Sequence, residues 1–417
     1  MEKKNVPKIR FPGFTEPWEQ RKLSELATIH ARIGWQNLRT SEFLDNGDYM
    51  LITGTDFKDG AINYSTCHYV EKERYDQDKH IQINNGSILI TKDGTLGKVA
   101  YVQGLTMPAT LNAGIFNVQI RNENEVDGKY LFQYLKAPYL MNYVSQKATG
   151  GTIKHLNQNI LVDFPIVLPN KFEQVKIGTF FEKLDKLITL HHRKLENLKK
   201  QKKGLLQKMF PEKGKKVPEI RFPEFTNDWE QRKLEEYLIV STEKNKDNTY
   251  DKGDVLSVSG DYGIVNQIEF QGRSFAGVFV SNYGVVHTGD IVYTKSPLKC
   301  NPYGIIKTNK GKVGIVSTLY AVYHPKKNIF SNFVQTYFEL HTRMNNYMNP
   351  LVNKGAKNDM KVSSQNALKG NVIFPSYEEQ KTISEFFTNL DNLISLHQRK
   401  LEHLQKQKKA LLQQMFV

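Results

Sequence analysis

The chain has 417 residues and is basic, with 58 Lys and Arg against 43 Asp and Glu, a formal net charge of +15 and a pI near 9.4. This length predicts two to three domains, and the charge favours a polyanionic partner, most often nucleic acid, over the alternative of a generally basic surface. Cys67 and Cys300 form no CxxC pair, and no apolar segment resembles a signal peptide or a membrane span, which argues against disulfide-rich, zinc-ribbon and membrane classes and predicts a cytoplasmic protein.

Residues 1–23 are predicted to form an N-terminal arm whose sequence returns later in the chain. PKIRFPGFTEPWEQRKL at 7–23 is repeated as PEIRFPEFTNDWEQRKL at 218–234, with Trp18 and Trp229 at equivalent positions. Proline and aromatic residues ahead of WEQRKL predict an extended segment that anchors apolar side chains on a neighbouring surface, followed by a short helix or strand. The alternative is that aromatic side chains of the arm stack on DNA bases; these are Phe11, Phe14 and Trp18.

Residues 24–169 are predicted to form a mixed α/β domain. Turn signals such as Asn46-Gly47-Asp48 separate short apolar segments along this part of the chain. The expected strands and the single expected helix are, in order, 49–53, 87–91, 99–102, 115–120 and 130–145.

The segment TKDGTLGK follows the second of these strands and carries candidate DNA-binding residues. Its glycines allow a close backbone approach, its hydroxyl groups can bind phosphate oxygens, and its lysines can neutralise phosphate charge. The candidates are Thr91, Lys92, Gly94, Thr95, Gly97 and Lys98. A weaker candidate segment, TGGTIK, adds Thr152 and Lys154. The alternative for each segment is an ordinary solvated turn.

Residues 170–210 are predicted to form a long helix. Apolar residues recur at steps of four and three, which is the heptad pattern of a coiled-coil seam. The predicted seam comprises Ile177, Phe181, Leu184, Ile188, His191, Leu195 and Leu198. The same rhythm places Lys202 on the seam beside His191. We favour the interpretation that polar residues at these seam positions set the register of the helices. The alternative is that His191 senses pH. Such a helix would extend roughly 50 Å.

The same order of segments then repeats. A basic linker at 211–217 leads to an arm at 218–234, a domain at 235–375 and a long helix at 376–417. The second helix aligns with the first without a gap, so each is the expected partner of the other; its seam residues are Ile383, Phe387, Leu390, Ile394, His397, Leu401 and Leu404.

The second domain aligns with the first only in scattered segments. GDIVYTK corresponds to GSILITK, so the loop after this strand is again a candidate for DNA contact. The candidates in this domain are Thr294, Lys295, Ser296, Lys299, Lys354 and Lys357.

The predicted fold class is therefore α+β, with two mixed α/β domains, two long coiled-coil helices and an internal repeat; the resemblance given below implies that the helices are antiparallel, separate the domains and make the repeat pseudo-two-fold. The histidines show no HExxH motif, and no GxxxxGK[ST] segment is present. Asn301-Pro302-Tyr303 only partly resembles the Asn-Pro-Pro-Tyr of amino-methyltransferases and is interpreted as a loop. We expect no catalytic residue and no metal site in this chain.

These motifs resemble those of the specificity subunit of type I restriction-modification enzymes, and the resemblance covers essentially the whole chain. It rests on the duplicated arm RFPxFxxxWEQRKL, the GxIxxTK strand and loop, and the Pro-x-x-x-Glu-Gln entry into a helix that ends QKxxLLQxMF. The resemblance implies two target recognition domains, each reading one half of a bipartite DNA sequence, with two conserved antiparallel helices between them.

The resemblance also implies partners for the chain. These are two modification subunits that bind S-adenosylmethionine and two restriction subunits that use ATP and Mg²⁺, so the chain itself would hold no cofactor and no catalytic group. Because the two domains differ, the half-sites should differ, and the nearly identical arms and helices should give one partner two equivalent docking places. Half-sites one helical turn apart are about 34 Å from each other, which a helix of roughly 50 Å can span. The alternatives are a coiled-coil adaptor without DNA readout and a self-contained restriction enzyme.

Overall fold

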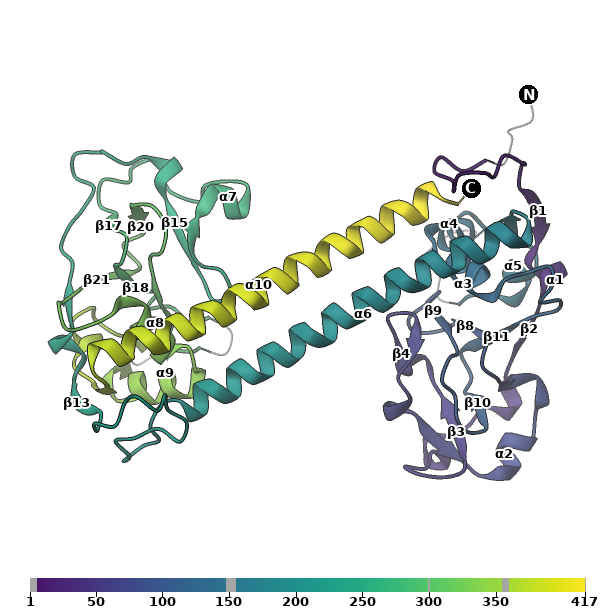
Figure 1. The fold of residues 1–417 in the computed structure, drawn as a ribbon, viewed down its shortest axis with the longest axis horizontal. Coiled ribbons are helices and arrows are strands. Elements are labelled where there is room, and N and C mark those ends of the chain that lie inside the picture. Colours follow the sequence, from purple (N-terminus) through teal and green to yellow (C-terminus); the bar gives the residue numbers. More distant parts are fainter. Residues whose placement is uncertain (1–5, 148–154, 299–300, 355–359, 417) are drawn as a thin grey trace. The chain divides into compact units, whose positions relative to one another are not determined.

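A computed structural model (Figure 1) describes residues 6–147, 155–298, 301–354 and 360–416. The chain divides into two compact units. Unit 1 comprises Met1–Arg193 together with Gln398–Val417, and unit 2 comprises Lys194–His397. Each unit therefore contains part of both long helices.

The first sheet of unit 1 has four antiparallel strands in the order β2-β11-β8-β9. Their bounds are Ala27–Ala31, Ile115–Ile120, Ile88–Thr91 and Val99–Tyr101. The predicted strands at 87–91, 99–102 and 115–120 are confirmed to within one residue at each end. β8 is buried along its whole length, which is why its sequence is a continuous apolar run without alternation.

A second sheet of unit 1 has the order β6-β3-β10-β7, in which β3 and β10 are parallel. Its strands are His68–Val70, Tyr49–Ile52, Ala109–Leu111 and Gln82–Ile83. Arg32, just after β2, is buried against this sheet and donates to the Leu111 carbonyl at 2.9 Å and to the Thr110 hydroxyl at 3.3 Å. This guanidinium therefore joins the two sheets, and its burial lowers its pKa. The shorter elements are α1 Leu23–Leu26, α2 Lys72–Asp76, β4 Phe57–Lys58 and β5 Ala61–Ile62.

The single helix predicted at 130–145 is wrong. The structure has α3 at Gly128–Lys136 and α4 at Pro138–Lys147, interrupted at Ala137. Proline at the first position of α4 disfavours helical geometry at the preceding residue and lacks the N–H that a continuous helix needs. Leu140 and Val144 are the buried residues of α4, and Met141 is only half-buried. α5 Gln158–Val162 and β12 Pro165–Leu168 lead to the first long helix.

Unit 2 repeats the first sheet and the helix pair of unit 1. Strands in the order β14-β21-β18-β19 have the bounds Leu238–Val240, Ala321–Pro325, Ile291–Tyr293 and Ile306–Thr308. The helices are α8 Ser331–Phe338 and α9 His341–Met348. Each unit thus has the same frame of one four-stranded sheet and two short helices.

The rest of unit 2 departs from unit 1. It forms two-stranded sheets and one further helix in place of a second four-stranded sheet, within the described residues. These elements are β15 Leu256–Ser259, β16 Gly263–Asn266, α7 Gln267–Gln271, β17 Gly284–Val286, β20 Gly314–Val316, β22 Asn353–Lys354 and β23 Met360–Lys361.

Each arm ends as a strand of a two-stranded sheet. β1 (Glu19–Lys22) pairs with β12, and β13 (Glu230–Lys233) pairs with β24 (Asn371–Phe374). Trp18 and Trp229 are buried in the cores of their units. The anchoring interpretation is therefore confirmed for both tryptophans, and stacking of Trp18 on a DNA base is excluded in this structure because its indole is not exposed.

Both long helices have 38 residues: α6 is Lys171–Lys208 and α10 is Tyr377–Gln414. Within unit 1 they run antiparallel, since Phe181 stacks on Phe416 at 5.7 Å and Asp185 pairs with Lys408 at 2.5 Å. Unit 2 has the same arrangement, with Lys202 paired to Asp391 at 2.5 Å. The residues expected on the seam are all buried or half-buried.

The Glu-Gln pair at the start of each long helix connects the helix to its arm and to its domain. Glu173 is buried and accepts two hydrogen bonds from Arg10, at 2.7 and 2.8 Å. Arg221 makes the same bidentate contact with Glu379, at 2.7 Å for both bonds. Hydrogen bonding to these carboxylates raises the pKa of each arginine. Paired donors and acceptors of this kind give a fixed geometry, so the arms are held on the helix starts.

The glutamine of each pair fixes the short helix that packs beside it. Gln174 accepts the N–H of Asp127 at 2.9 Å, just before α3, and Gln380 accepts the N–H of Phe330 at 2.9 Å, just before α8. These matching contacts establish that α3 and α8 occupy equivalent places in the two units. On this correspondence, Lys136 at the end of α3 is the counterpart of Glu339 at the end of α8.

Candidate nucleic-acid interface

The loop between β8 and β9 holds the first group of predicted DNA-binding residues. The Thr91 hydroxyl is buried; it donates to the Thr95 carbonyl and accepts the Lys98 N–H at 2.9 Å. Gly94 and Gly97 have φ angles of 69° and 72°, which glycine adopts without steric cost. Thr91 therefore shapes the loop and does not present its hydroxyl to a phosphate, which corrects the role expected for it. Gly94, Thr95 and Lys98 are exposed.

Lys92 has a different environment from Lys98. Its N–H donates to the Gly114 carbonyl at 2.8 Å, and its carbonyl accepts the Leu156 N–H at 2.9 Å. Its ammonium lies 5.7 Å from the centre of the Phe116 ring, a separation at which a cation is attracted to an aromatic face. Lys92 is thus half-buried against β11, while Lys98 extends from the loop.

The equivalent loop of unit 2 joins β18 to β19. Thr294 is buried, and its hydroxyl accepts the Ile305 N–H at 3.0 Å, so it too shapes its loop and is corrected in the same way. Lys295 has a positive φ of 54° and donates to the Thr318 carbonyl at 3.5 Å. Burial and the neighbouring charge of Lys244 lower the pKa of Lys295. An anion placed beside this lysine would relieve both effects.

Some of the remaining candidates lie in the described residues and the others lie outside them. Ser296 is exposed in the loop after β18, and Lys354 lies in β22. Asn301-Pro302-Tyr303 lies in the same loop as Ser296, as interpreted from the sequence. The candidates outside the described residues are Thr152, Lys154, Lys299 and Lys357.

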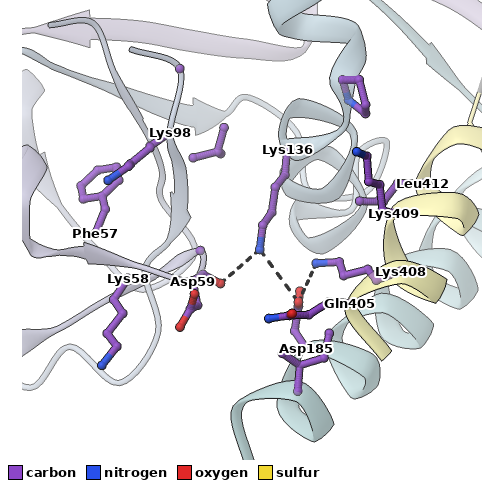
Figure 2. Close-up of a pocket in the computed structure, with 15 residues that line it drawn as sticks. Phe57, Lys58, Asp59, Lys98, Lys136, Asp185, Gln405, Lys408, Lys409 and Leu412 are labelled. Carbon is purple, nitrogen blue, oxygen red and sulfur yellow. Dashed lines mark hydrogen bonds and ion pairs between the residues drawn. The ribbon is translucent and has the colours of Figure 1, made fainter. Parts of the chain in front are cut away.

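A pocket of about 620 Å³ lies in unit 1 beside the β8–β9 loop (Figure 2). Its walls come from the β4–β5 hairpin, the end of the loop, the end of α3 and the facing parts of α6 and α10. Five lysines and two aspartates line it, which gives it an excess of positive charge: Lys58, Lys98, Lys136, Lys408, Lys409, Asp59 and Asp185.

Asp185 is the centre of the polar contacts in this pocket. It accepts from Lys408 at 2.5 Å and from Gln133 at 2.8 Å, and the Lys136 ammonium lies 3.9 Å away. Lys136 also donates to the Asp59 carbonyl at 3.1 Å (Figure 2). Two lysines therefore share one carboxylate. Burial lowers the pKa of Lys408 to about 8, with the charge of Lys136 as the next cause.

The equivalent place in unit 2 has no excess of positive charge. Lys202 donates to both Glu339 and Asp391. Burial disfavours its charge, but the two carboxylates outweigh this effect and raise the pKa of Lys202. Lys307 is buried near the same carboxylates. Its burial lowers its pKa, and the charges of Glu339 and Asp391 act in the opposite direction. Two lysines here face two carboxylates, so the cluster is neutral.

Two surface features were not predicted from the sequence. The first is the contribution of Lys58 and Lys136 to the pocket, because the residues that converge there are far apart in the sequence. The second is an exposed apolar segment after α7, where Phe275 is 57% and Phe279 is 86% exposed and Arg273 lies 4.5 Å from the Phe275 ring centre. The signal was present in RSFAGVF, where aromatic residues stand beside an arginine in a polar, turn-rich segment.

The described residues contain no cluster of three or more His, Cys, Asp or Glu side chains arranged to hold a metal ion. Among the described helices, none is both long and apolar enough to cross a membrane.

The repeated frame agrees with a family comparison. The model of the type I restriction modification DNA specificity domain matches the sequence twice, over residues 15–200 and 211–406. The chain belongs to this family. The first match begins in the N-terminal arm, the second begins in the linker just before the second arm, and each ends in a long helix, so each specificity domain combines one sheet-and-helix frame with one long helix.

Relatives of this specificity protein extend over nearly its whole length. The putative type I restriction enzyme MjaX specificity subunit of Methanocaldococcus jannaschii is 24% identical over 435 residues, covering 98% of this chain and 95% of the relative. The MjaVIII specificity subunit of the same organism is 23% identical over 418 residues and covers 95% of each chain.

Solved structures share the fold. The crystal structure of the type I restriction-modification S subunit from M. genitalium has a TM-score of 0.60 at 15% identity and covers 99% of both chains. A chain from a structure that describes complex assembly and conformational transition of the type I R-M system has a TM-score of 0.50 at 14% identity, covering 98% of this chain and 99% of that one.

Proposed function

We propose that the chain is the sequence-specific DNA-binding subunit of a type I restriction-modification complex. Each unit reads one half of an asymmetric, bipartite DNA site and directs partner methyltransferase and restriction subunits to it. The observation that carries this proposal is the repetition of one sheet-and-helix frame with different loops and different second sheets. Because the two frames are alike, both recognition domains would be placed in the same way on their helices. Because their loops differ, they would bind different half-sites.

The long helices fit a role as the spacer between these readers. We propose that α6 and α10 form an antiparallel coiled coil with a pseudo-two-fold axis, supported by the matching pairs Asp185–Lys408 and Asp391–Lys202. A buried polar residue on a seam specifies register, and register sets the spacing of the half-sites. A helix of 38 residues extends about 57 Å, more than the ~34 Å between half-sites one turn apart.

The loops after β8 and β18 are the proposed phosphate contacts. Lys92 and Lys98 in the first and Lys295 in the second supply charge, Gly94, Thr95 and Gly97 allow backbone approach, and Thr91 and Thr294 hold the loops in shape. Replacing Lys98 or Lys295 by alanine should weaken binding and reduce the salt slope by about one for each lost phosphate contact. An unchanged slope would argue against phosphate contact by that lysine.

The exposed segment of Arg273, Phe275 and Phe279 is a proposed base-reading or wedge element of unit 2. Aromatic side chains that remain exposed in the free protein can stack on bases or enter a base step. Phe279→Ala should alter preference in one half-site only, which methylation sequencing would detect. Equal loss at both half-sites would contradict this assignment.

The outward faces of the long helices supply two equivalent docking places for a partner. Leu190 on α6 is 60% exposed, and its counterpart Leu396 on α10 is 56% exposed. Leu187 and Leu393 form a second exposed pair beside them. Exposed leucines kept at the same place in both repeats fit an interface used twice, and we assign it to the two methyltransferase subunits. S-adenosylmethionine, ATP and Mg²⁺ would then bind to partner subunits.

The decisive test is DNA binding by the complex assembled with its methyltransferase subunits. Selection from random duplexes should yield a site with two unlike half-sites separated by a fixed spacer, and methylation should require both the chain and the methyltransferase. Leu190→Glu with Leu396→Glu should prevent assembly, with each single variant reducing it to one partner. A complex that assembles but selects no sequence would favour a coiled-coil adaptor and overturn the proposal.

A further inference from the structure

The lysine pocket of unit 1 has more positive charge than its own carboxylates neutralise. Lys136 and Lys408 share Asp185, and Lys58, Lys98 and Lys409 line the same space. Unpaired charge in a half-buried position is unfavourable, and a buried cation is normally satisfied by an anion. A site of this kind is completed by an anion from outside the chain.

Unit 2 shows what such a completed site looks like. At the place equivalent to Lys136 it has Glu339, which accepts a hydrogen bond from Lys202, the counterpart of Lys408. The two clusters therefore differ at this position and at one more, where Lys307 of unit 2 stands in place of Ala100 in unit 1. Where unit 2 supplies its own carboxylate, unit 1 supplies a second lysine and an open pocket.

The Lys136 side chain of this pocket is held in place before any ligand arrives. The Lys136 ammonium is fixed by the Asp59 carbonyl at 3.1 Å and lies 5.4 Å from the Phe132 ring centre. Gly60 has a φ of 87°, and a Cβ at this residue would come within 2.5 Å of the Lys136 ammonium. The tight hairpin thus leaves room for Lys136 beside it, so the ammonium needs little reorganisation to bind an anion.

We propose that this pocket binds a phosphate of the DNA backbone, with Lys136 and Lys408 as its principal cations, and that unit 2 lacks the corresponding contact. The inference rests on the proposed DNA-binding function. A DNA phosphate is favoured because the pocket continues directly from the β8–β9 loop: Gly97, Lys98 and Val99 belong to its wall. A phosphate that contacts Lys98 at the loop therefore has its neighbours in reach of the pocket. An anion there also raises the depressed pKa of Lys408 towards its ordinary range.

The test uses the full chain assembled with its methyltransferase subunits and a duplex that carries its selected site. Lys136→Glu replaces the second lysine of the pocket by the carboxylate that unit 2 has at this place, and Lys136→Gln serves if the first variant folds poorly. The slope of log affinity against log salt should fall by about one, while the methylated sequence stays the same. Lys213→Glu, an exposed lysine of the linker outside the pocket and outside the leucine faces of α6 and α10, is the charge-matched control and should leave the slope unchanged.

A scan of single neutral methylphosphonates along the duplex locates the contact. The wild-type complex should lose affinity at one phosphate on the side of the unit 1 half-site, and the Lys136→Glu complex should not respond at that position. If the variant changes neither the slope nor the scan in a complex that still selects its sequence, the pocket inference fails while the proposed function stands. If Lys136→Glu weakens binding of the methyltransferase subunit without a change in slope, the pocket receives an acidic side chain and the inference is overturned. Loss of sequence selection by the wild-type complex would defeat the proposed function itself.

Discussion

Two lysines at equivalent positions of the long helices have opposite electrostatic surroundings. Lys202 donates to two carboxylates, whereas Lys408 shares Asp185 with Lys136. Both lysines are buried, so their ion pairs offset a desolvation penalty to different extents. With Glu339 in unit 2 and Lys136 in unit 1 at equivalent places, the unit 2 cluster has a second carboxylate where the unit 1 cluster has a second lysine on one carboxylate.

This difference predicts unequal effects of the same substitution. Lys202→Met should lower the free energy of unfolding of unit 2 by about 1–3 kcal/mol because Glu339 and Asp391 lose their cation. This is less than for a fully buried pair, since the Asp391 side chain is 40% exposed. Lys408→Met should be nearly neutral in unit 1, since Asp185 keeps Gln133 and Lys136. Hydrogen exchange of α8 and α3 in denaturant would measure the two units separately; equal losses would contradict the prediction.

Lys408 also predicts a pH dependence with a defined sign. Its pKa is about 8 in the folded chain against an ordinary 10.5, so between these values the unfolded state binds more protons. The free energy of unfolding therefore rises with pH across this window and falls as pH decreases to about 8. Subtracting the profile of Lys408→Met from that of the native chain, by exchange of α3, isolates this contribution. A difference that declines from pH 8 to 10.5 would refute the depressed pKa.

At the residue scale, the sequence predicted which positions lie on the seam but not what their polar members contact. Lys202 was placed there by the heptad rhythm, and its link to Asp391 follows from antiparallel pairing. Glu339 and Lys136 come from the recognition domains, and no periodicity in the helices indicates them. Thr91 shows a second limit of sequence-based prediction. A hydroxyl beside glycines and lysines has the pattern of a phosphate contact, but the Thr91 hydroxyl hydrogen-bonds within its own loop.

At the scale of elements, α6 approaches the start of α3 so closely that only glycine fits at one position. A Cβ at Gly178 would lie 2.6 Å from the Asp127 carboxylate oxygen Oδ1 and 2.8 Å from the Tyr130 backbone nitrogen. The counterpart in unit 2 is Ser384, whose buried hydroxyl donates to the Gln380 carbonyl at 2.6 Å. The two helix starts are thus packed at different distances from their domains.

Two alanine substitutions in the same helix should therefore have opposite effects. Gly178→Ala should destabilise unit 1 by about 1–3 kcal/mol, because the backbone it meets must move. A Cβ at Gly204 has nothing within 4 Å, so Gly204→Ala should stabilise by about 0.5–1 kcal/mol through helix propensity. Thermal unfolding of the full chain with hydrogen exchange of α6 would check both. Destabilisation by Gly204→Ala would show an unrecognised contact at that position.

Element types were predictable where one pattern dominated. The buried strands β8 and β11 were apparent as apolar runs between turn signals, and both long helices from uninterrupted heptads. The break between α3 and α4 was missed because the apolar positions continue across Ala137. Pro138 alone does not reveal the break, since proline is also common in the first turn of a helix. Strand order and the parallel pairing of β3 with β10 depend on contacts distant in sequence, which local patterns do not contain.

At the scale of the whole molecule, much of the identity between the two repeats has an internal cause. Arg10 and Arg221 hold the arms on Glu173 and Glu379, and the phenylalanines near the helix ends fill the two cores. These residues are equal because each unit is built around the same helix start and the opposite helix end. The exposed leucines Leu190 and Leu396 have no such internal role in the described structure, and their occurrence in both repeats supports the proposed partner surface.

The same organisation predicts that recognition is modular. Residues 24–169 begin after Leu23, which directly follows the β1 strand paired with β12. They end at Pro169, whose carbonyl accepts a hydrogen bond from Gln174 on α6. Exchanging this segment for that of another family member, with the bounding residues kept, should change one half-site and leave the other half-site and the spacer intact. Methylation sequencing of cells that carry the chimaera together with its methyltransferase would measure all three. The spacer is the most informative of them, because under the proposed function it depends on helix register at Asp185–Lys408 and Lys202–Asp391 and not on either recognition domain. A chimaera with an altered spacer or two altered half-sites would mean that the recognition domains, and not the helices alone, set the register.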